Sequence, residues 1–399
     1  MNRQTKAPIK VAHFITTISK GGATENTLLS AAGCQEMEHY EVSVIAGPPI
    51  KSEGDLLGLA KSLGVEVRII PSLHKPIHLI NDLRALAALI SELIRGGYDV
   101  VHTHGSKAGV LGRLAAVLVG VKAVVHTIHG LPLYPDMPPL SKAFYLGVER
   151  MAARVTHEML SVTHQLRLDA LSGRVGRASR FSVVRSGMDL EPFLSGSDRR
   201  TAARQSLGLK SNQVAIGSIG RVCAQKGQDV ILDVASDVID LAPDSRFLFI
   251  GSGDLLEPLI KETSELELSQ FVQWTGSVEP EEIHYYLSAL DILVHVSERE
   301  GLARVIPQAL ASGKPVISYD LDGSPEVITD RFNGRLIPPF DRQELTDALV
   351  ELVRDRGLRE EMGARGPEVV DPAFRTEAMV EGVHQSYQRA LKLSGHIAD

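Results

Sequence analysis

The stretch SEREGLARVIPQALASGKPVISYD, residues 297–320, places polar side chains at the entrance of an apolar helix. Glu300 stands before Gly301 at the end of an apolar run, and Gln308 follows about two helical turns later. A carboxylate and an amide can together bind vicinal hydroxyl groups, which act as both donors and acceptors. The alternative is a solvated glutamate and an incidental glutamine. We prefer a binding site, because a glutamate beside glycine at a strand end has no evident packing purpose.

A second polar stretch, GSIGRVCAQKGQDVIL, carries two cations near the start of a helix. A strand ends at Arg221, and Lys226 follows in a glycine-containing turn. A planar guanidinium and a mobile ammonium group beside a helix start can clamp a diphosphate. The loop lacks the Gly-x-x-x-x-Gly-Lys-Ser/Thr pattern of an ATPase P-loop. Surface lysines are common, but a strand-end arginine followed by Lys-Gly favours an anion site.

Two further stretches carry weaker signals. Gly21 and Gly22 end a strand and open a helix, where the backbone can approach a phosphate closely. A tight turn without a ligand is the more common explanation of such a pair. In HTIHG, His126 and His129 stand at a predicted strand end, where a neutral imidazole can bind a sugar hydroxyl. From the residues alone, a satisfied histidine in a polar loop is the preferred explanation.

The elements that must position these residues are short, apolar, β-branched runs separated by helical stretches. Such runs are typical of parallel strands covered on both faces. In the helical stretch 79–97, one apolar face is predicted and Gly96-Gly97 end the helix. That face comprises Leu79, Leu83, Leu86, Ile90, Leu93 and Ile94. The strands predicted in the first half are 9–18, 41–47, 65–70, 99–104, 123–130, 159–162 and 181–187.

After a loop at 187–200 the same alternation begins again. It predicts an α/β protein with two doubly wound parallel sheets and a ligand site in the cleft between them, at the carboxyl ends of the strands. The expected domains are 1–190 and 191–375. A final helix within 376–399 could cap either domain, including by packing back on the N-terminal one. The strands predicted in the second half are 214–222, 245–253, 271–276, 291–297, 315–320 and 334–339.

The bulk composition agrees with a two-domain enzyme. The chain has 399 residues, 44% hydrophobic and 23% charged, which is typical of a soluble globular protein. No apolar segment is long enough for a membrane helix or a signal peptide, so we expect a cytoplasmic protein. Cys34 and Cys223 make no metal spacing and are expected to be free thiols.

Charge is divided unevenly along the chain. Residues 1–190 contain 21 Lys and Arg against 15 Asp and Glu, whereas residues 191–399 contain 21 against 34. The net charges are therefore +6 and −13. A basic first half is compatible with peripheral contact with an anionic inner membrane. Scattered surface charge without a partner explains the count equally well, and no nucleic acid partner is expected.

Eight motifs in sequence order resemble those of the retaining glycosyltransferases of family 4, along nearly the whole chain. The resemblance implies the GT-B fold of two facing Rossmann-like domains, with the acceptor on the N-terminal side and the donor on the C-terminal side. It also implies transfer from a nucleotide-sugar, often a UDP-sugar, with retained anomeric configuration and no cofactor or metal ion. The motifs are KGGATENTLLSA, DVVHTHGSKAGVLGRLAA, VVHTIHG, VVRSGMDLEPF, IGRVCAQKGQDVIL, FIGSGDL, VQWTGSV and SEREGLARVIPQALASGKPVISYDLDGSPEVI.

The resemblance also implies a role for each site residue. The chain departs from the family at Gln308, where the family has a second glutamate that grips the nucleotide ribose. Glutamine keeps the hydrogen-bonding ability but lacks the charge, so we still expect an active enzyme. The resemblance implies that Gly21 and Gly22 approach the donor phosphates and that Arg221 and Lys226 stabilise the leaving diphosphate. It implies that the donor sugar is bound by Glu300, Gly301 and the amides of Leu302 and Ala303. His129 is expected to lie near the reacting carbon.

No second carboxylate stands out as a nucleophile, and the resemblance implies same-face attack assisted by the leaving phosphate, which is therefore the expected mechanism. The acceptor is expected to be a glycan or a lipid-linked saccharide of envelope or exopolysaccharide synthesis. Two alternatives remain: a nucleotide-sugar 2-epimerase of the same fold, and a non-catalytic nucleotide-sugar binder. An NAD-linked oxidoreductase is disfavoured, because GSGDLL at 251–256 lacks the third glycine of the dinucleotide motif.

Overall fold

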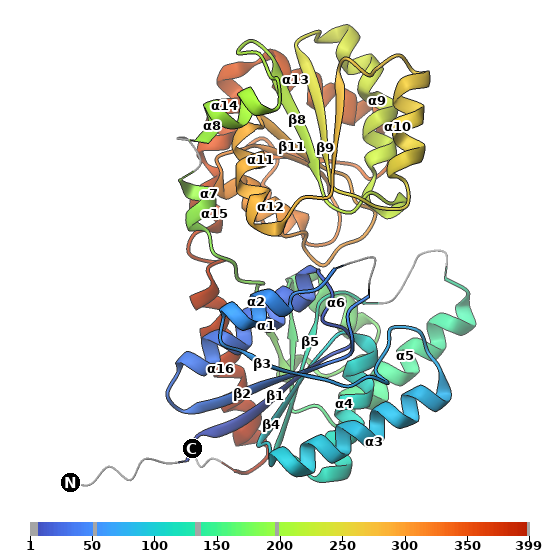
Figure 1. The fold of residues 1–399 in the computed structure, drawn as a ribbon, viewed down its shortest axis with the longest axis vertical. Helices are drawn as coiled ribbons and strands as arrows, with labels where there is room; N and C mark the ends of the chain where they lie inside the picture. Colours follow the sequence, from blue (N-terminus) through green and yellow to red (C-terminus); the bar gives the residue numbers. More distant parts are fainter. Residues whose placement is uncertain (1–6, 51–53, 132–136, 196–198, 397–399) are drawn as a thin grey trace, which may run out of the picture. The chain divides into compact units, whose positions relative to one another are not determined.

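The protein is described by a computed structural model that covers residues 7–50, 54–131, 137–195 and 199–396. The chain divides into two compact units (Figure 1). The first contains Met1–Met188 together with Thr376–Asp399, and the second contains Asp189–Arg375. The last helix is thus grouped with the first unit. None of the helices in the described ranges combines the length and the apolar character needed to cross a bilayer.

The first unit is built on a seven-stranded parallel sheet with the order β3-β2-β1-β4-β5-β6-β7. Its central strands are buried along almost their whole length, as the apolar runs of the sequence predict. The strands are β1 (Ile9–Ile15), β2 (Tyr40–Ala46), β3 (Glu66–Ile69), β4 (Val100–His104), β5 (Ala123–Ile128), β6 (Glu158–Ser161) and β7 (Phe181–Val183).

Helices cover both faces of this sheet (Figure 1). One face packs against α1 and α16, and the other packs against α3 and α4. In α16 the apolar residues Met379, Val383, Tyr387 and Leu391 recur every fourth position, so they form one buried stripe on the sheet. The helices are α1 (Gly22–Glu36), α2 (Leu57–Ser62), α3 (Leu79–Gly96), α4 (Ser106–Val119), α5 (Pro139–Arg154), α6 (His164–Ser172) and α16 (Thr376–Leu393).

The apolar face predicted for α3 is partly wrong. Leu93 is buried and Leu86 and Ile90 are half-buried, but Leu79, Leu83 and Ile94 are 75%, 58% and 66% exposed. The helix is apolar around most of its circumference, so periodicity alone did not select the face that packs. The face in the core is the one that carries Ala85, Leu89 and Leu93.

The second unit repeats the architecture with a six-stranded parallel sheet in the order β10-β9-β8-β11-β12-β13. Two doubly wound parallel sheets were predicted, and this prediction is confirmed. The strands are β8 (Val214–Ile219), β9 (Ser245–Ile250), β10 (Val272–Gly276), β11 (Ile292–His295), β12 (Val316–Tyr319) and β13 (Gly334–Ile337). The helices are α7 (Glu191–Leu194), α8 (Arg200–Ser206), α9 (Gln228–Leu241), α10 (Leu256–Glu265), α11 (Ile283–Ala289), α12 (Val305–Ala311), α13 (Arg342–Arg354), α14 (Arg356–Ala364) and α15 (Gly366–Val370).

Each sheet contains one point at which the strand order reverses. The reversal lies between β1 and β4 in the first unit and between β8 and β11 in the second. Ligands of open parallel sheets bind beyond the carboxyl ends of the strands at such points. The loops that follow β8 and β11 carry Arg221, Lys226 and Glu300, so the sequence motifs and the topology indicate the same place.

Candidate functional site

The loop after β8 is shaped by Gly227, which joins a short 3-10 turn (Ala224–Lys226) to α9. Its φ of 71° lies in the left-handed region, and a Cβ at this position would come within 2.4 Å of the Val296 carbonyl oxygen. Both facts require glycine. The Gln228 side chain donates to the Arg221 carbonyl at 3.2 Å and closes the loop. The turn thus holds Lys226 against the end of β11.

The loop after β11 is held to this turn through Gln225. The Gln225 side chain donates to the Arg299 carbonyl at 2.7 Å. In the other direction, the Gln225 carbonyl accepts from the Glu298 N–H and from the Ser297 hydroxyl, both at 2.9 Å. Asp322, in the loop after β12, accepts from the Glu300 N–H at 2.6 Å. Three loops at the carboxyl edge of the sheet therefore fix the backbone around Glu300.

The side chains of Lys226 and Glu300 form an ion pair within this frame. Both are largely covered, with 19% and 26% of their side chains exposed. Burial, and to a smaller extent the nearby Arg221 charge, lower the pKa of Lys226 to about 8, although Cys223 acts in the opposite direction. Arg221 itself is exposed at the mouth of the loop.

His295, the last residue of β11, lies beside this pair. Its Nε2 is 3.9 Å from a carboxylate oxygen of Glu300 and, among the residues that the structure describes, has no hydrogen-bond partner, although the atom is buried. Burial and the charge of Lys226 lower the pKa of His295 to about 3, so the imidazole is neutral. A buried nitrogen without a partner is costly.

The segment after Glu300 leads into α12. Gly301 and Ala303 are buried and Leu302 is half-buried. Within the described ranges, the N–H groups of Leu302 and Ala303 donate to no other group of the protein. Gln308 lies in α12 with a half-buried side chain whose amide makes no hydrogen bond in the described part of the chain. These groups are open to an oxygen-rich ligand.

The remaining predicted residues belong to the first unit. Gly21 and Gly22 are exposed at the start of α1, and a Cβ at Gly21 would meet only open space. His129 follows β5, is half-buried, and its Nε2 lies 3.0 Å from His104 Nδ1. His126 points to the other face of the sheet, where it bonds Thr103 at 2.8 Å in the core. His126 is thus a satisfied histidine, as the residues alone suggested, but it lies in the buried strand β5 and not in a polar loop.

In the second unit, the structure pairs Lys226 with Glu300 and places Arg221 close enough to act on Lys226 electrostatically. Gly21, Gly22 and His129 lie in the first unit. Sequence reasoning missed His295 and Asp322. The signal for His295 was the one polar residue within the apolar run ILVHV. Asp322 had no signal, because its bond to the Glu300 backbone joins loops that are 22 residues apart.

A cavity of the second unit lies at the opposite edge of its sheet. It has a volume of about 1020 Å³ and contains none of the predicted site residues. Its cations are held by neighbouring groups: Arg204, for example, donates to Asp291 and to three backbone carbonyls. We therefore locate the candidate site by chemistry and topology and not by cavity size.

Comparison with known families agrees with this architecture. The model described as "Glycosyl transferases group 1" matches residues 199–369, and the model described as "Glycosyl transferase 4-like domain" matches residues 21–187. The chain belongs to the group 1 glycosyltransferases of family 4 and is a glycosyltransferase, which confirms the family indicated by the eight motifs.

Two curated relatives illustrate the range of this family. The UDP-Gal:alpha-D-GlcNAc-diphosphoundecaprenol alpha-1,3-galactosyltransferase of Escherichia coli is 29% identical over 359 residues, which cover 89% of this chain and 91% of that protein. The D-inositol 3-phosphate glycosyltransferase of Nocardia farcinica is 30% identical over 313 residues, which cover 74% and 67% of the two chains.

Solved structures show the fold. Anabaena HepE in complex with UDP and glucose has a TM-score of 0.80 at 19% identity, with 95% of this chain and 99% of that chain covered. Sucrose-phosphate synthase from Thermosynechococcus elongatus has a TM-score of 0.81 at 19% identity, with 96% and 98% covered. The two units are the Rossmann-like halves of the GT-B fold, as expected from the motifs.

Proposed function

We propose that the enzyme transfers a sugar from a UDP-sugar to a saccharide carried on a polyprenyl diphosphate, with retention of anomeric configuration and without a metal ion. The observation that carries the proposal is the Lys226–Glu300 pair beside Arg221, at the strand-order reversal of the second unit. The E. coli relative, named for a UDP-galactose donor and a diphosphoundecaprenol acceptor, supports the choice of donor and acceptor. The UDP complexes of HepE support the same base.

The chemistry follows from the charges at this site. When the glycosidic bond of the donor breaks, negative charge develops on the diphosphate. Arg221 and Lys226 stabilise that charge more strongly in the transition state than in the ground state. Glu300 and the N–H groups of Leu302 and Ala303 hold the sugar hydroxyls. The only carboxylate near Lys226 in the described ion pairs is thus assigned to binding, and we propose that the leaving phosphate assists attack from the same face.

Three residues of the first unit are assigned to ligand binding: Gly21, Gly22 and His129. The two glycines leave the start of α1 uncovered, so a phosphate can approach its N–H groups. Burial lowers the pKa of His129 to about 4, so its imidazole is neutral and can donate a hydrogen bond to a sugar hydroxyl.

A lipid-linked acceptor also fits the surface of the first unit. On α5, Leu140, Phe144 and Met151 are exposed beside Lys142 and Arg154, while the acidic Glu149 is buried in an ion pair with Arg113. An apolar and basic helical face is suited to an anionic membrane surface. We therefore propose that the first unit contacts the membrane that carries the acceptor.

Transfer assays test the proposal. Purified enzyme is incubated with UDP-, GDP- and ADP-sugars, with and without a polyprenyl-diphosphate saccharide, in the presence of EDTA. We expect UDP release only with a UDP-sugar and acceptor together, and an unchanged anomeric configuration in the product by NMR. Epimerised sugar and UDP without acceptor would identify an epimerase, and donor binding without consumption would identify a binding protein.

Membrane contact is tested separately by flotation with vesicles that contain anionic lipid. We expect Phe144→Ser with Leu140→Ser to lower the bound fraction. The matched control is Leu266→Ser, which changes an exposed leucine of the second unit. If the wild type, the α5 double variant and Leu266→Ser bound vesicles equally, α5 would not be the membrane-contacting helix.

A further inference from the structure

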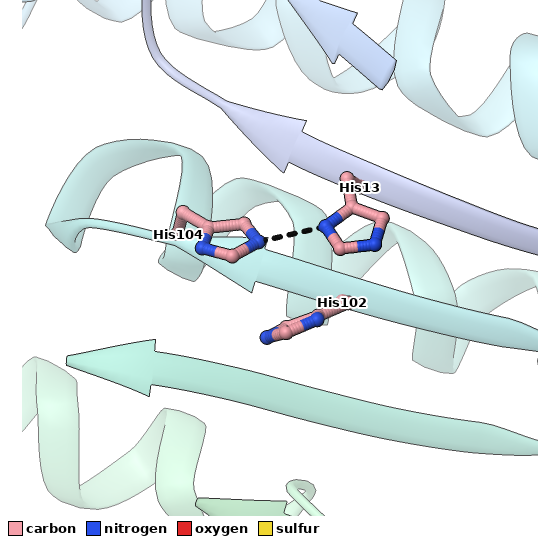
Figure 2. Close-up of side chains that lie close together, drawn as sticks. All are labelled: His13, His102 and His104. Carbon is pink, nitrogen blue, oxygen red and sulfur yellow. Dashed lines mark hydrogen bonds between the residues drawn. The ribbon is translucent and has the colours of Figure 1, made fainter. Parts of the chain in front are cut away.

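A continuous chain of hydrogen bonds runs through the core of the first unit to His129. Figure 2 shows its centre, where His13 Nδ1 and His104 Nε2 are 2.9 Å apart. On one side, His104 Nδ1 bonds His129 Nε2 at 3.0 Å. On the other side, His13 Nε2 bonds the Tyr387 hydroxyl at 2.9 Å, and this hydroxyl also bonds His102 Nδ1 at 2.8 Å. The chain ends at Thr127, whose hydroxyl bonds His102 Nε2 at 2.7 Å.

The chain exists because of strand register and the return of the C-terminal helix. His13 on β1 and His102 on β4 are direct neighbours across the sheet, and His104 follows two positions along the same face. Thr127 on β5 pairs with His104. The helix α16 packs on this face and inserts Tyr387 between the two strands. Four separate segments are needed to complete the chain.

Every internal member of the chain is buried and neutral. His13, His102 and Tyr387 are 0% exposed and His104 is 1% exposed. Burial lowers the pKa of His13 to about 3, lowers those of His102 and His104 well below the ordinary value, and raises that of Tyr387. A neutral imidazole has one donor nitrogen and one acceptor nitrogen. A hydroxyl likewise donates once.

Because each imidazole and each hydroxyl donates only once, the whole hydrogen-bond chain has two possible proton arrangements. In the first, Thr127 donates to His102 and each following group donates to the next, so His129 accepts at Nε2 and carries its proton on Nδ1. In the second, every bond is reversed and His129 carries its proton on Nε2. The tautomer of one ring cannot change alone without leaving two facing donors or two facing acceptors in the core, which is costly.

The Thr127 end selects between the two arrangements. In the described part of the protein, the Thr127 hydroxyl bonds only His102. In the first arrangement it donates that bond and is satisfied. In the second it accepts from His102, and its own proton has no acceptor. The first arrangement is therefore the more stable one.

We propose that Tyr387, His13 and His104 are positioning residues that orient the His129 ring and place its proton on Nδ1, so that His129 presents a donor to an oxygen of the ligand. The proposal deepens the function proposed above and rests on it for the role of His129. The central hydroxyl of this hydrogen-bond chain belongs to Tyr387 in α16, so the C-terminal helix influences the tautomer of His129.

A metal site is the competing explanation of these three histidines, because each offers one ring nitrogen that lies within 4.8 Å of the nitrogens offered by the other two. Both nitrogens of His13, His102 and His104 already take part in hydrogen bonds. An ion would have to displace several of these bonds in a fully buried space. The hydrogen-bond chain accounts for every ring nitrogen without such a change.

Tyr387→Phe tests the proposal, with Tyr40→Phe as the matched control. Both tyrosines are buried between the sheet and α16, and their rings are 5.7 Å apart. Tyr40 bonds His384 and Gln388 and lies outside the chain to His129. We expect Tyr387→Phe to lower kcat about tenfold, by loss of orientation of His129, with a change in donor KM of less than about twofold. Tyr40→Phe should leave both constants unchanged.

The tautomer itself is read in the full-length protein without donor or acceptor, by NMR of ¹⁵N-labelled histidine. The His129 signals are assigned by their loss in His129→Ala. We expect a protonated Nδ1 in the wild type and a mixture of tautomers in Tyr387→Phe. If that variant does not fold, Thr127→Val removes the other end of the chain and should give the same mixture.

Three outcomes would each overturn the proposal. The first is a proton on Nε2 of His129 in the wild type, and the second is an unchanged His129 tautomer in folded Tyr387→Phe or Thr127→Val. The third is stoichiometric zinc whose removal abolishes the His13 and His104 signals of the folded protein. Because the tautomer is measured without turnover, its failure is distinct from failure of the proposed function, which the transfer assays test. An active His129→Ala variant would contradict only the role of His129 in that function.

Discussion

Lys226 and Glu300 form an ion pair that joins the loop after β8 to the loop after β11. The pair spans the strand-order reversal of the second sheet, so a cation and a carboxylate share one position. Under the proposed function, we expect Glu300 to turn to the sugar when the donor binds, which leaves the charge of Lys226 available to the diphosphate. Binding of the diphosphate and binding of the sugar would then be coupled.

Glu300→Gln separates these two roles. We expect UDP to bind with an affinity within about threefold of the wild type, because Lys226 and Arg221 remain. We expect kcat/KM for the UDP-sugar to fall about a hundredfold, because the amide has one uncharged acceptor oxygen where the carboxylate has two charged ones. Calorimetry with UDP and initial rates with the donor measure the two quantities. Equal losses in both would contradict the division of roles.

Removing the clamp cations should slow the chemical step itself. We expect Arg221→Ala and Lys226→Ala each to lower kcat about a hundredfold or more with saturating donor, because their stabilisation is greatest in the transition state. Lys261→Ala, which removes an exposed lysine paired with Glu265, is the control and should be unchanged. Unchanged turnover in both clamp variants would show that the assignment is wrong.

The lowered pKa of Lys226 predicts a pH dependence of nucleotide affinity. The diphosphate binds the ammonium form, which is present below the pKa of about 8 and is lost as the pH rises through it. UDP affinity should then fall by up to about tenfold per pH unit, as expected for one linked proton. Calorimetry between pH 7 and pH 10 measures this slope. Lys226→Arg keeps its charge and should flatten the profile; an equally steep profile in that variant would exclude Lys226 as the cause.

Gln308→Glu tests the departure from the family pattern. We expect the substitution to keep or improve affinity for the donor, by up to about threefold, because a carboxylate accepts stronger hydrogen bonds from ribose hydroxyls. Titration with UDP and with the donor gives the comparison. A large loss of affinity would show that Gln308 does not face the ribose.

Gly227 should be essential to the stability of the second unit. In Gly227→Ala, a left-handed φ and a close approach to the Val296 carbonyl act together, so we expect a loss of about 3 kcal/mol in the free energy of unfolding. Gly208→Ala has a similar φ of 66° but meets no atom within 4 Å, so it should lose only about 1 kcal/mol. Denaturation curves of the two variants measure the difference. Equal losses would show that the contact with Val296 is relieved by movement of the loop.

The local elements and the residues that bear the donor chemistry were predictable from the sequence, because they are encoded locally. Apolar runs such as VAIGSI predict buried parallel strands, and the loops after them must contain Arg221, Lys226 and Glu300. The same reasoning failed for Leu79 and Leu83, since a helix that is apolar on several sides does not itself specify which side is packed.

Only the tertiary structure decided the contacts between segments that are distant in the chain. Asp322 reaches the Glu300 backbone, and Tyr387 reaches His13 across 374 positions, because strand register and helix docking bring them together. Hydrophobic periodicity carries no information about such partners. The sequence alone therefore determined the two parallel sheets and the chemistry of their loops. The fold determined which buried polar groups satisfy one another, because a buried donor must find its acceptor in three dimensions.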